Sequence, residues 1–164
     1  MEGRTIRGRS GIQKQLACAM TMHLVWGEIP YYQPRVGTGR YMAPDSFMVR
    51  SGNVPACVNH WRDNDKILSC QATWGATSSG LVISHVLDDA IDYERGILEA
   101  VQRQQLYWSY GDGAHPDATR LAIAAHGGKT IAHAVAQLER VSFGHVAYVA
   151  IPAFPQEPIR WIGL

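Results

Sequence analysis

A run of apolar and β-branched residues, SFGHVAYVAIP over 142–152, constrains the fold more than any other stretch of the chain. Its residue types predict a buried strand that begins at His145 and is anchored by Val146, Tyr148 and Ile151. An imidazole at the start of such a strand has two interpretations. It is either a structural histidine with satisfied hydrogen bonds, or a general base for a nucleophile elsewhere in the chain.

The stretches before this strand predict mostly helix. Thr77, Ser78 and Ser79 are N-cap residue types, and apolar residues follow them, so a helix is expected to begin near Ser78. Prolines and glycines over 30–44 indicate a loop. Further helices are expected over 53–65 and 116–128, a strand over 129–138, and an edge strand in the final IRWIGL. Helices first and strands afterwards predict an α+β fold, with helices packed on an antiparallel sheet.

Length and charge indicate a single globular domain over 1–164. Of the 164 residues, 46% are apolar and 18% are charged, which is an ordinary globular composition. The net charge of +1 gives no global field that would favour nucleic acid or a membrane as partner. Basic residues gather only in an N-terminal arm over 1–14, through Arg4, Arg7, Arg9 and Lys14. This arm is interpreted as a solvated tail, with contact to an anionic partner as the alternative.

The cysteines and the absence of targeting patterns suggest the compartment. Cys18, Cys57 and Cys70 are an odd set without a C-x-x-C pair, so neither a disulfide framework nor a zinc site is expected. No signal-peptide pattern and no apolar run of about 18 residues are present. The chain is therefore expected to be made in the cytoplasm with reduced thiols. If it acts outside, a specialised secretion system or lysis would release it.

Three patches resemble one enzyme superfamily. GHVAYV, which begins at Gly144, resembles the histidine strand of the papain-like NlpC-type and CHAP peptidoglycan hydrolases. SSGLVISHV, which begins at Ser78, resembles their nucleophile box, a cysteine followed by Ser-Gly-Leu-Val at a helix start. AIAAHGGKTIAHA, over 122–134, resembles the segment before the histidine strand in secreted amidase toxins of this superfamily. The resemblance covers about half of the chain and implies a papain-like core.

The chain departs from this family at the nucleophile, because the position of the family's cysteine holds Ser78. Three explanations remain open: a cysteine-to-serine variant, a natural homologue that has lost catalysis, or another thiol, with Cys70 nearest. A serine hydroxyl without a strong base is a far weaker nucleophile than a thiolate. The resemblance implies that Ser78 lies in the first turn of a helix, within about 4 Å of the His145 ring.

The resulting hypothesis is an amidase or endopeptidase that cleaves an amide in the peptide stem of peptidoglycan, in the manner of an amidase toxin or a phage lysin. His145 is the candidate base, and Gln156 and Glu157 are the nearest candidates for the group that orients it. The expected partners are a peptidoglycan peptide and an immunity or inhibitor protein, with no cofactor or metal. The alternative is a non-catalytic phage structural or binding protein.

Overall fold

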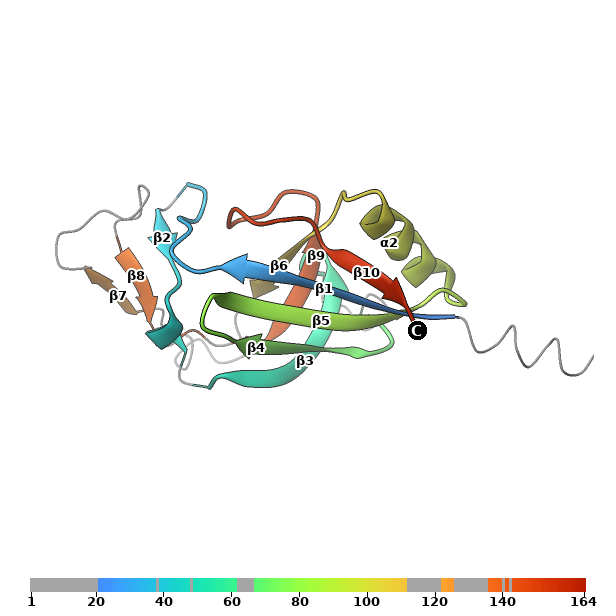
Figure 1. Ribbon diagram of the computed structural model, residues 1–164, viewed down its shortest axis with the longest axis horizontal. Helices are drawn as coiled ribbons and strands as arrows, with labels where there is room; N and C mark the ends of the chain where they lie inside the picture. The colour runs from blue at the N-terminus through green and yellow to red at the C-terminus, as the bar shows by residue number, and fades with distance from the viewer. Residues whose placement is uncertain are drawn as a thin grey trace, which may run out of the picture.

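The structure is a computed structural model that describes residues 21–37, 39–47, 49–61, 67–111, 122–125, 136–139, 141 and 143–164. In this part of the chain, most residues with regular structure lie in strands (Figure 1). A seven-stranded sheet has the order β10-β1-β5-β4-β3-β9-β6, and a three-stranded sheet has the order β2-β8-β7. The strands are β1 (Met22–Pro30), β2 (Arg40–Tyr41), β3 (Ser51–Val58), β4 (Gln71–Ala76), β5 (Gly80–Asp88), β6 (Tyr107–Gly111), β7 (Ala122–Ala125), β8 (Ala136–Glu139), β9 (His145–Val149) and β10 (Arg160–Gly163).

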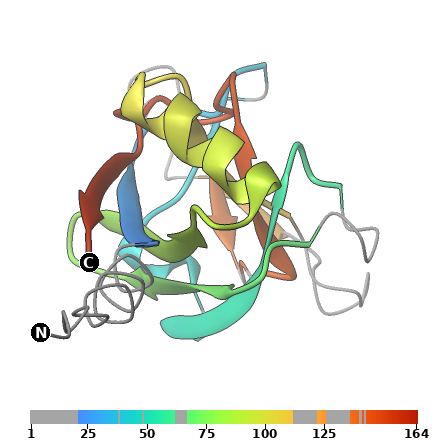
Figure 2. The same ribbon diagram turned by 90° about the vertical axis from the view of Figure 1, so that its right-hand side faces the viewer.

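The large sheet is mixed. All its neighbouring strands are antiparallel except β3 and β9, which run parallel. The sheet curls strongly, so that its two ends enclose a common interior (Figures 1 and 2). The parallel pair joins two segments that are far apart in sequence. This pairing brings the end of β3 next to the strand that opens with His145.

The predicted fold class, helices packed on an antiparallel sheet with a papain-like core, is wrong. The segments 53–58 and 80–88, which were expected to be helical, are strands β3 and β5. Along β5 the odd-numbered residues from Leu81 to Leu87 are buried while the residues between them are only partly buried. That period of two, in a run rich in β-branched residues, is the pattern of a strand rather than of an amphipathic helix.

Of the other predicted elements, one helix is wrong and two strands are confirmed. Strand β7 lies within the stretch 116–128 that was expected to be a helix, so that prediction is wrong over the residues described. Strand β8 overlaps the expected strand over 129–138, most of which lies outside the described residues, as does the basic arm. The strand that begins at His145 and the final edge strand are both confirmed. Val146 and Tyr148 are fully buried, whereas Ile151 is 87% exposed and anchors nothing.

The helix α2 (Asp92–Gln102) follows β5 and packs beside β5 and β10 (Figure 1). Its buried positions are Glu94, Ile97, Leu98 and Val101, spaced as i, i+3, i+4 and i+7 on one face. Glu94 is 1% exposed, but both carboxylate oxygens are satisfied. They accept hydrogen bonds from the backbone N–H groups of Ser69 (2.7 Å) and Asp88 (2.8 Å). The buried carboxylate therefore ties the helix to the end of β5 and to the segment that precedes β4.

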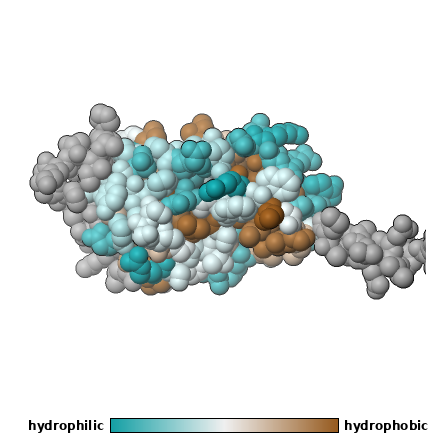
Figure 3. Space-filling model, viewed as in Figure 1, coloured by the Kyte–Doolittle hydropathy of each residue, from teal (hydrophilic) through white to brown (hydrophobic). Residues whose placement is uncertain are grey.

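Hydrophobic side chains on the face seen in Figure 3 form separate patches among hydrophilic and neutral ones. Trp108 and Tyr148 are among the largest fully buried side chains, and their rings pack with centroids 4.5 Å apart.

Among the described residues, no helix has the length and apolar character that a membrane crossing requires.

Because His85 is buried in this core, we expect the fold to lose stability in acid. His85 is 2% exposed; its Nε2–H donates to the Cys70 carbonyl (3.0 Å), so its Nδ1 accepts the Tyr148 hydroxyl proton (2.8 Å). Burial lowers the pKa of His85, and the Cys70 carbonyl and Glu94 act in the opposite direction. The neutral ring is thus the form that folding favours. Its stabilisation is complete above the unfolded value of 6.5 and is lost as pH falls through the lower folded value.

Urea unfolding measured from about pH 7.5 down to about pH 5 should therefore show a falling midpoint. His85→Gln should lower stability at neutral pH, because a fitted buried ring is lost, and should also flatten the dependence on pH. Parallel curves for the two proteins would show that His85 does not cause the acid sensitivity.

Candidate functional site

Three polar side chains from three different elements meet on the face of the sheet opposite the main core. His60 follows β3, Ser109 lies in the middle of β6, and His145 opens β9. In the antiparallel β6–β9 pair, Ser109 is opposite Ala147 and Gly111 is opposite His145. Ser109 and His145 are therefore diagonal neighbours on one face, and the parallel β3–β9 pair brings His60 beside them.

The three side chains form one hydrogen-bonded chain. The Ser109 Oγ lies 3.0 Å from His60 Nε2, and His60 Nδ1 lies 2.8 Å from His145 Nε2. For the serine hydroxyl to donate to His60 Nε2, the His60 proton must be on Nδ1, from which it donates to His145 Nε2. We assign these tautomers because they let every bond in the chain have one donor and one acceptor. In this state Ser109 has a base and the base has an orienting partner.

The three hydrogen-bonded side chains differ in how deeply they are buried. His145 is only 5% exposed, and its ring meets that of His60 edge-on at 80°, with centroids 5.1 Å apart. His60 is exposed, and Ser109 is partly buried. A fixed inner ring thus holds an accessible outer ring in place, which is the arrangement expected for a base that must reach a substrate.

The backbone that carries His60 is strained. Asn59 and His60 both have positive φ, 50° and 63°. Asparagine adopts this left-handed conformation readily, whereas it costs His60 roughly 1–2 kcal/mol. Asn59 N–H donates to the Tyr148 carbonyl (3.0 Å), and Trp61 N–H donates to the Val58 carbonyl (3.0 Å). These bonds hold a tight left-handed turn at the end of β3 and direct the imidazole back over the sheet. Strain of this kind, held by surrounding bonds, is typical of functional sites.

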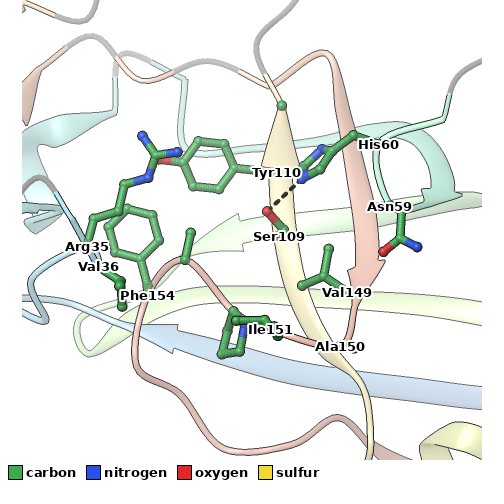
Figure 4. Close-up of a pocket in the computed structure, with 13 residues that line it drawn as sticks. Arg35, Val36, Asn59, His60, Ser109, Tyr110, Val149, Ala150, Ile151 and Phe154 are labelled. Carbon is green, nitrogen blue, oxygen red and sulfur yellow. Dashed lines mark hydrogen bonds between the residues drawn. The ribbon is translucent and has the colours of Figure 1, made fainter.

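The serine–histidine pair opens into a pocket with a volume of about 640 Å³ (Figure 4). Ser109 and His60 form one side of it in this view, and Arg35 lies at the other, with Tyr110 and Phe154 between them. Most of the remaining wall is apolar and comes from the segment that follows β9. A partly apolar cavity beside a nucleophile and its base is what substrate binding requires.

Gln156, one of the two candidates for the orienting group, has another role. Its side-chain amide accepts a hydrogen bond from Trp108 N–H (3.0 Å) and donates one to the Trp108 carbonyl (2.9 Å). Since β6 is an edge strand, this amide takes the place of a neighbouring strand beside Trp108. It fixes the strand that carries Ser109 but bonds to neither histidine in the described contacts. Glu157, the other candidate, is exposed.

The structure does not bring Ser78 to His145. Ser78 is an exposed residue in the turn between β4 and β5, and no helix begins there. The row of paired residues through His145 crosses β3 near Pro55 and reaches β4 at Gln71. Strand β4 runs from Gln71 to Ala76, a length of roughly 16 Å at about 3.3 Å per residue. Ser78 lies beyond the Ala76 end, which is the end farther from the row through His145. Its catalytic role stays a sequence-based prediction without structural support.

Cys70 comes closer in register but not in orientation. It directly precedes β4, and its carbonyl accepts the His85 hydrogen bond. The alternation of the strand gives Cys70 the side of Ala72 and Trp74, both of which belong to the main core. His145 lies on the opposite face of the sheet, so the structure places this thiol and this imidazole on different sides.

The sequence patterns above point to neither His60 nor Ser109. His60 lies within the stretch 53–65 that is predicted to be a helix, and Ser109 lies outside every predicted element. Trp108 and Tyr110 alternate with Ser109 and Gly111, and this alternation of large and small residues is a strand signal that includes Ser109. For His60, the signal was the preceding Asn59, because asparagine tolerates the left-handed turns that end strands.

No protein-family model, curated protein or solved structure matches the chain. Among the residues that the structure describes, no three histidine, cysteine or acidic side chains are grouped as a metal site. His115, His126 and His133 lie outside those residues.

Proposed function

We propose that the chain is a hydrolase that cleaves an acyl bond, an amide or an ester, with Ser109 as nucleophile and His60 as general base. The observation that carries this proposal is the continuous hydrogen-bonded chain from Ser109 through His60 to His145 at the mouth of a pocket. A nucleophile, a base and a group that orients the base are the three parts that serine-based acyl transfer needs.

The tautomers assigned above give a balanced reaction. Ser109 Oγ attacks the substrate carbonyl as its proton passes to His60 Nε2, and a tetrahedral intermediate forms. His60 then returns that proton to the leaving group as the acyl bond breaks, which leaves an acyl-serine. Water, deprotonated by His60, attacks this ester, and the proton finally returns to Ser109. Each step uses one proton on one nitrogen.

His145 is a positioning residue in this scheme. It contacts neither the nucleophile nor the substrate pocket in the described contacts, but its Nε2 accepts the hydrogen bond that His60 Nδ1–H donates throughout the cycle. A neutral imidazole stabilises the transient imidazolium less than a carboxylate would, because it contributes a dipole and not a charge. Its main contribution is therefore to fix the tautomer and the angle of the His60 ring.

The peptidoglycan stem amide stays a sequence-based prediction for the substrate. It came from a papain-like resemblance whose helix start at Ser78 is absent. The geometry supports the class of reaction, acyl transfer to a serine, and no particular cell-wall bond. Purified peptidoglycan is therefore one of several substrates to be offered, beside unrelated peptides and simple esters.

A fluorophosphonate probe should react covalently with the chain at Ser109, because a histidine-activated serine attacks the probe's phosphorus and displaces fluoride. Intact mass should increase by one probe adduct, and peptide mapping should place it on Ser109. Ser109→Ala should remain unlabelled although folded.

Two further variants serve as matched controls for the probe. Ser78→Ala and Cys70→Ala should label at the rate of the unmodified chain, since neither residue lies at the pocket. Labelling that persists in Ser109→Ala but disappears in Ser78→Ala would overturn the proposal in favour of the sequence-based nucleophile. No labelling of any variant would favour the non-catalytic alternative.

A further inference from the structure

The pocket continues beyond the catalytic side chains to a loop that carries Arg35. Val36, next to it, donates its backbone N–H to the Ala153 carbonyl (2.8 Å), which ties the loop to the segment that follows β9. The loop is also closed on itself: Arg35 N–H donates to the Arg40 carbonyl (2.7 Å), and Gly39 N–H donates to the Arg35 carbonyl (3.0 Å). The position of Arg35 at the rim is therefore fixed by the fold.

The closed loop depends on two glycines. Gly37 and Gly39 have φ values of 83° and 65°, a region that residues with a Cβ rarely adopt. The turn they form leaves the Arg35 side chain exposed at the rim of the pocket rather than folded against the sheet. The backbone is thus held while the guanidinium remains able to reach a ligand.

Arg35 is well suited to bind an anion. Among the residues that the structure describes, none that lines the pocket is acidic. Arg35 takes part in none of the ion pairs seen among the described residues, which include His23 with Asp89, Arg95 with Asp92 and Arg103 with Glu99. Its charge is permanent, and its planar donors fit a carboxylate in a two-point contact.

The neighbouring walls suggest how a ligand would be held. Tyr110 and Phe154, whose rings are stacked at 15°, lie between Arg35 and the catalytic pair in Figure 4. An extended acyl chain or peptide could pass over these rings, with its carbonyl at Ser109 and an acidic group at Arg35. Apolar walls weaken the competition from water for the charged end of such a ligand.

We propose that Arg35 makes the site selective for acidic peptides, with the carboxylate of an aspartate or glutamate near the scissile bond bound at Arg35. This inference rests on the proposed function for the position of the scissile bond, but the binding it predicts does not require catalysis. The same carboxylate chemistry could come from the C-terminus of a peptide. All test peptides should therefore have amidated C-termini, with one free-acid arm for comparison.

Binding should be measured on Ser109→Ala, so that no peptide is consumed. Two fluorescent-peptide libraries, identical except for glutamate or glutamine at each position in turn, should be titrated against this variant. At one position, glutamate should bind about fivefold more tightly than glutamine at low salt, and the advantage should shrink as salt increases. Adding Arg35→Gln should abolish the preference, and adding Arg35→Glu should shift it to lysine peptides.

Arg103→Gln provides the matched control, because it removes one exposed arginine charge at the C-cap of α2, at a residue that does not line the pocket. It should leave the glutamate preference unchanged. Equal binding of glutamate and glutamine peptides at all positions, or a preference that survives Arg35→Gln, would overturn the inference. So would a preference confined to the free-acid arm. If the preference is present but Ser109 never reacts with the fluorophosphonate, the acyl-hydrolase proposal fails and the Arg35 site remains.

Discussion

Replacing His60 with glycine is expected to lower kcat/KM for acyl hydrolysis by about 10²–10⁴-fold while the chain stays folded. The loss is large because the Ser109 hydroxyl, 3.0 Å from His60 Nε2, then has no base to accept its proton. The fold should tolerate the change, since His60 is exposed and its φ of 63° suits glycine better than histidine. Hydrolysis of the best substrate found by screening, followed beside thermal unfolding, measures both effects.

Chemical rescue makes this prediction more specific. His60→Gly leaves a space beside Ser109 that free imidazole can enter, so added imidazole should restore part of the lost activity. Imidazole should not restore Ser109→Ala. His23→Gln is the matched control, because His23 pairs with Asp89 (2.9 Å) and is not part of the pocket. Activity in His60→Gly within about threefold of the unmodified chain would exclude His60 as the base.

The sequence reveals the strand that carries His145 because its pattern is local. Val146 and Tyr148 alternate with small residues, and glycine and proline mark the two ends, so no distant contact is needed to recognise the strand. Strand β5 was misassigned because its N-cap-like serines and its apolar residues also fit the start of a helix. There the tertiary pairing with β1 and β4 decided the structure, which a single segment does not show.

The site was harder to predict than the strands because it depends on contacts between distant residues. His60 and His145 are 85 positions apart and meet only because β3 and β9 pair in parallel. Ser109 joins them through an antiparallel partner of β9. The strand pattern singles out His145, but the family motif points to Ser78 as its partner. Only the strand order shows which serine is adjacent.

Gly111 has a role in the site that its sequence position does not suggest. It is opposite His145 in the β6–β9 pair, and the imidazole lies directly over it. A Cβ added at Gly111 would be 2.7 Å from His145 Nδ1 and would overlap the adjacent Cε1 and Nε2 atoms. Real Cβ contacts are not this close, so the ring must move. Because His145 is only 5% exposed, it has little room to do so.

Gly111→Ala is therefore expected to reduce both stability and activity. Overpacking of this kind typically costs about 1–3 kcal/mol of the free energy of unfolding. Displacement of the His145 ring breaks its hydrogen bond to His60 Nδ1, so the His60 ring is no longer held in place. A shift of a catalytic group by about 1 Å can lower the rate by about 10²-fold. Urea unfolding and the rate of Ser109 labelling would measure the two losses. Unchanged labelling would show that the orientation of His145 does not control the base.

Two comparisons separate this effect from a general cost of adding a methyl group. Gly96 lies on the exposed side of α2, and a Cβ there meets nothing within 4 Å, so Gly96→Ala should raise stability by about 0.5–1 kcal/mol without changing activity. Combining Gly111→Ala with His145→Ala removes the ring that the new methyl group would strike. Gly111→Ala should therefore cost much less stability when it is added to His145→Ala than when it is made in the unmodified chain. Activity should stay low in the double variant. If the two losses in stability simply add, the methyl group and the ring do not collide, and the packing of His145 against Gly111 does not set the geometry of the site.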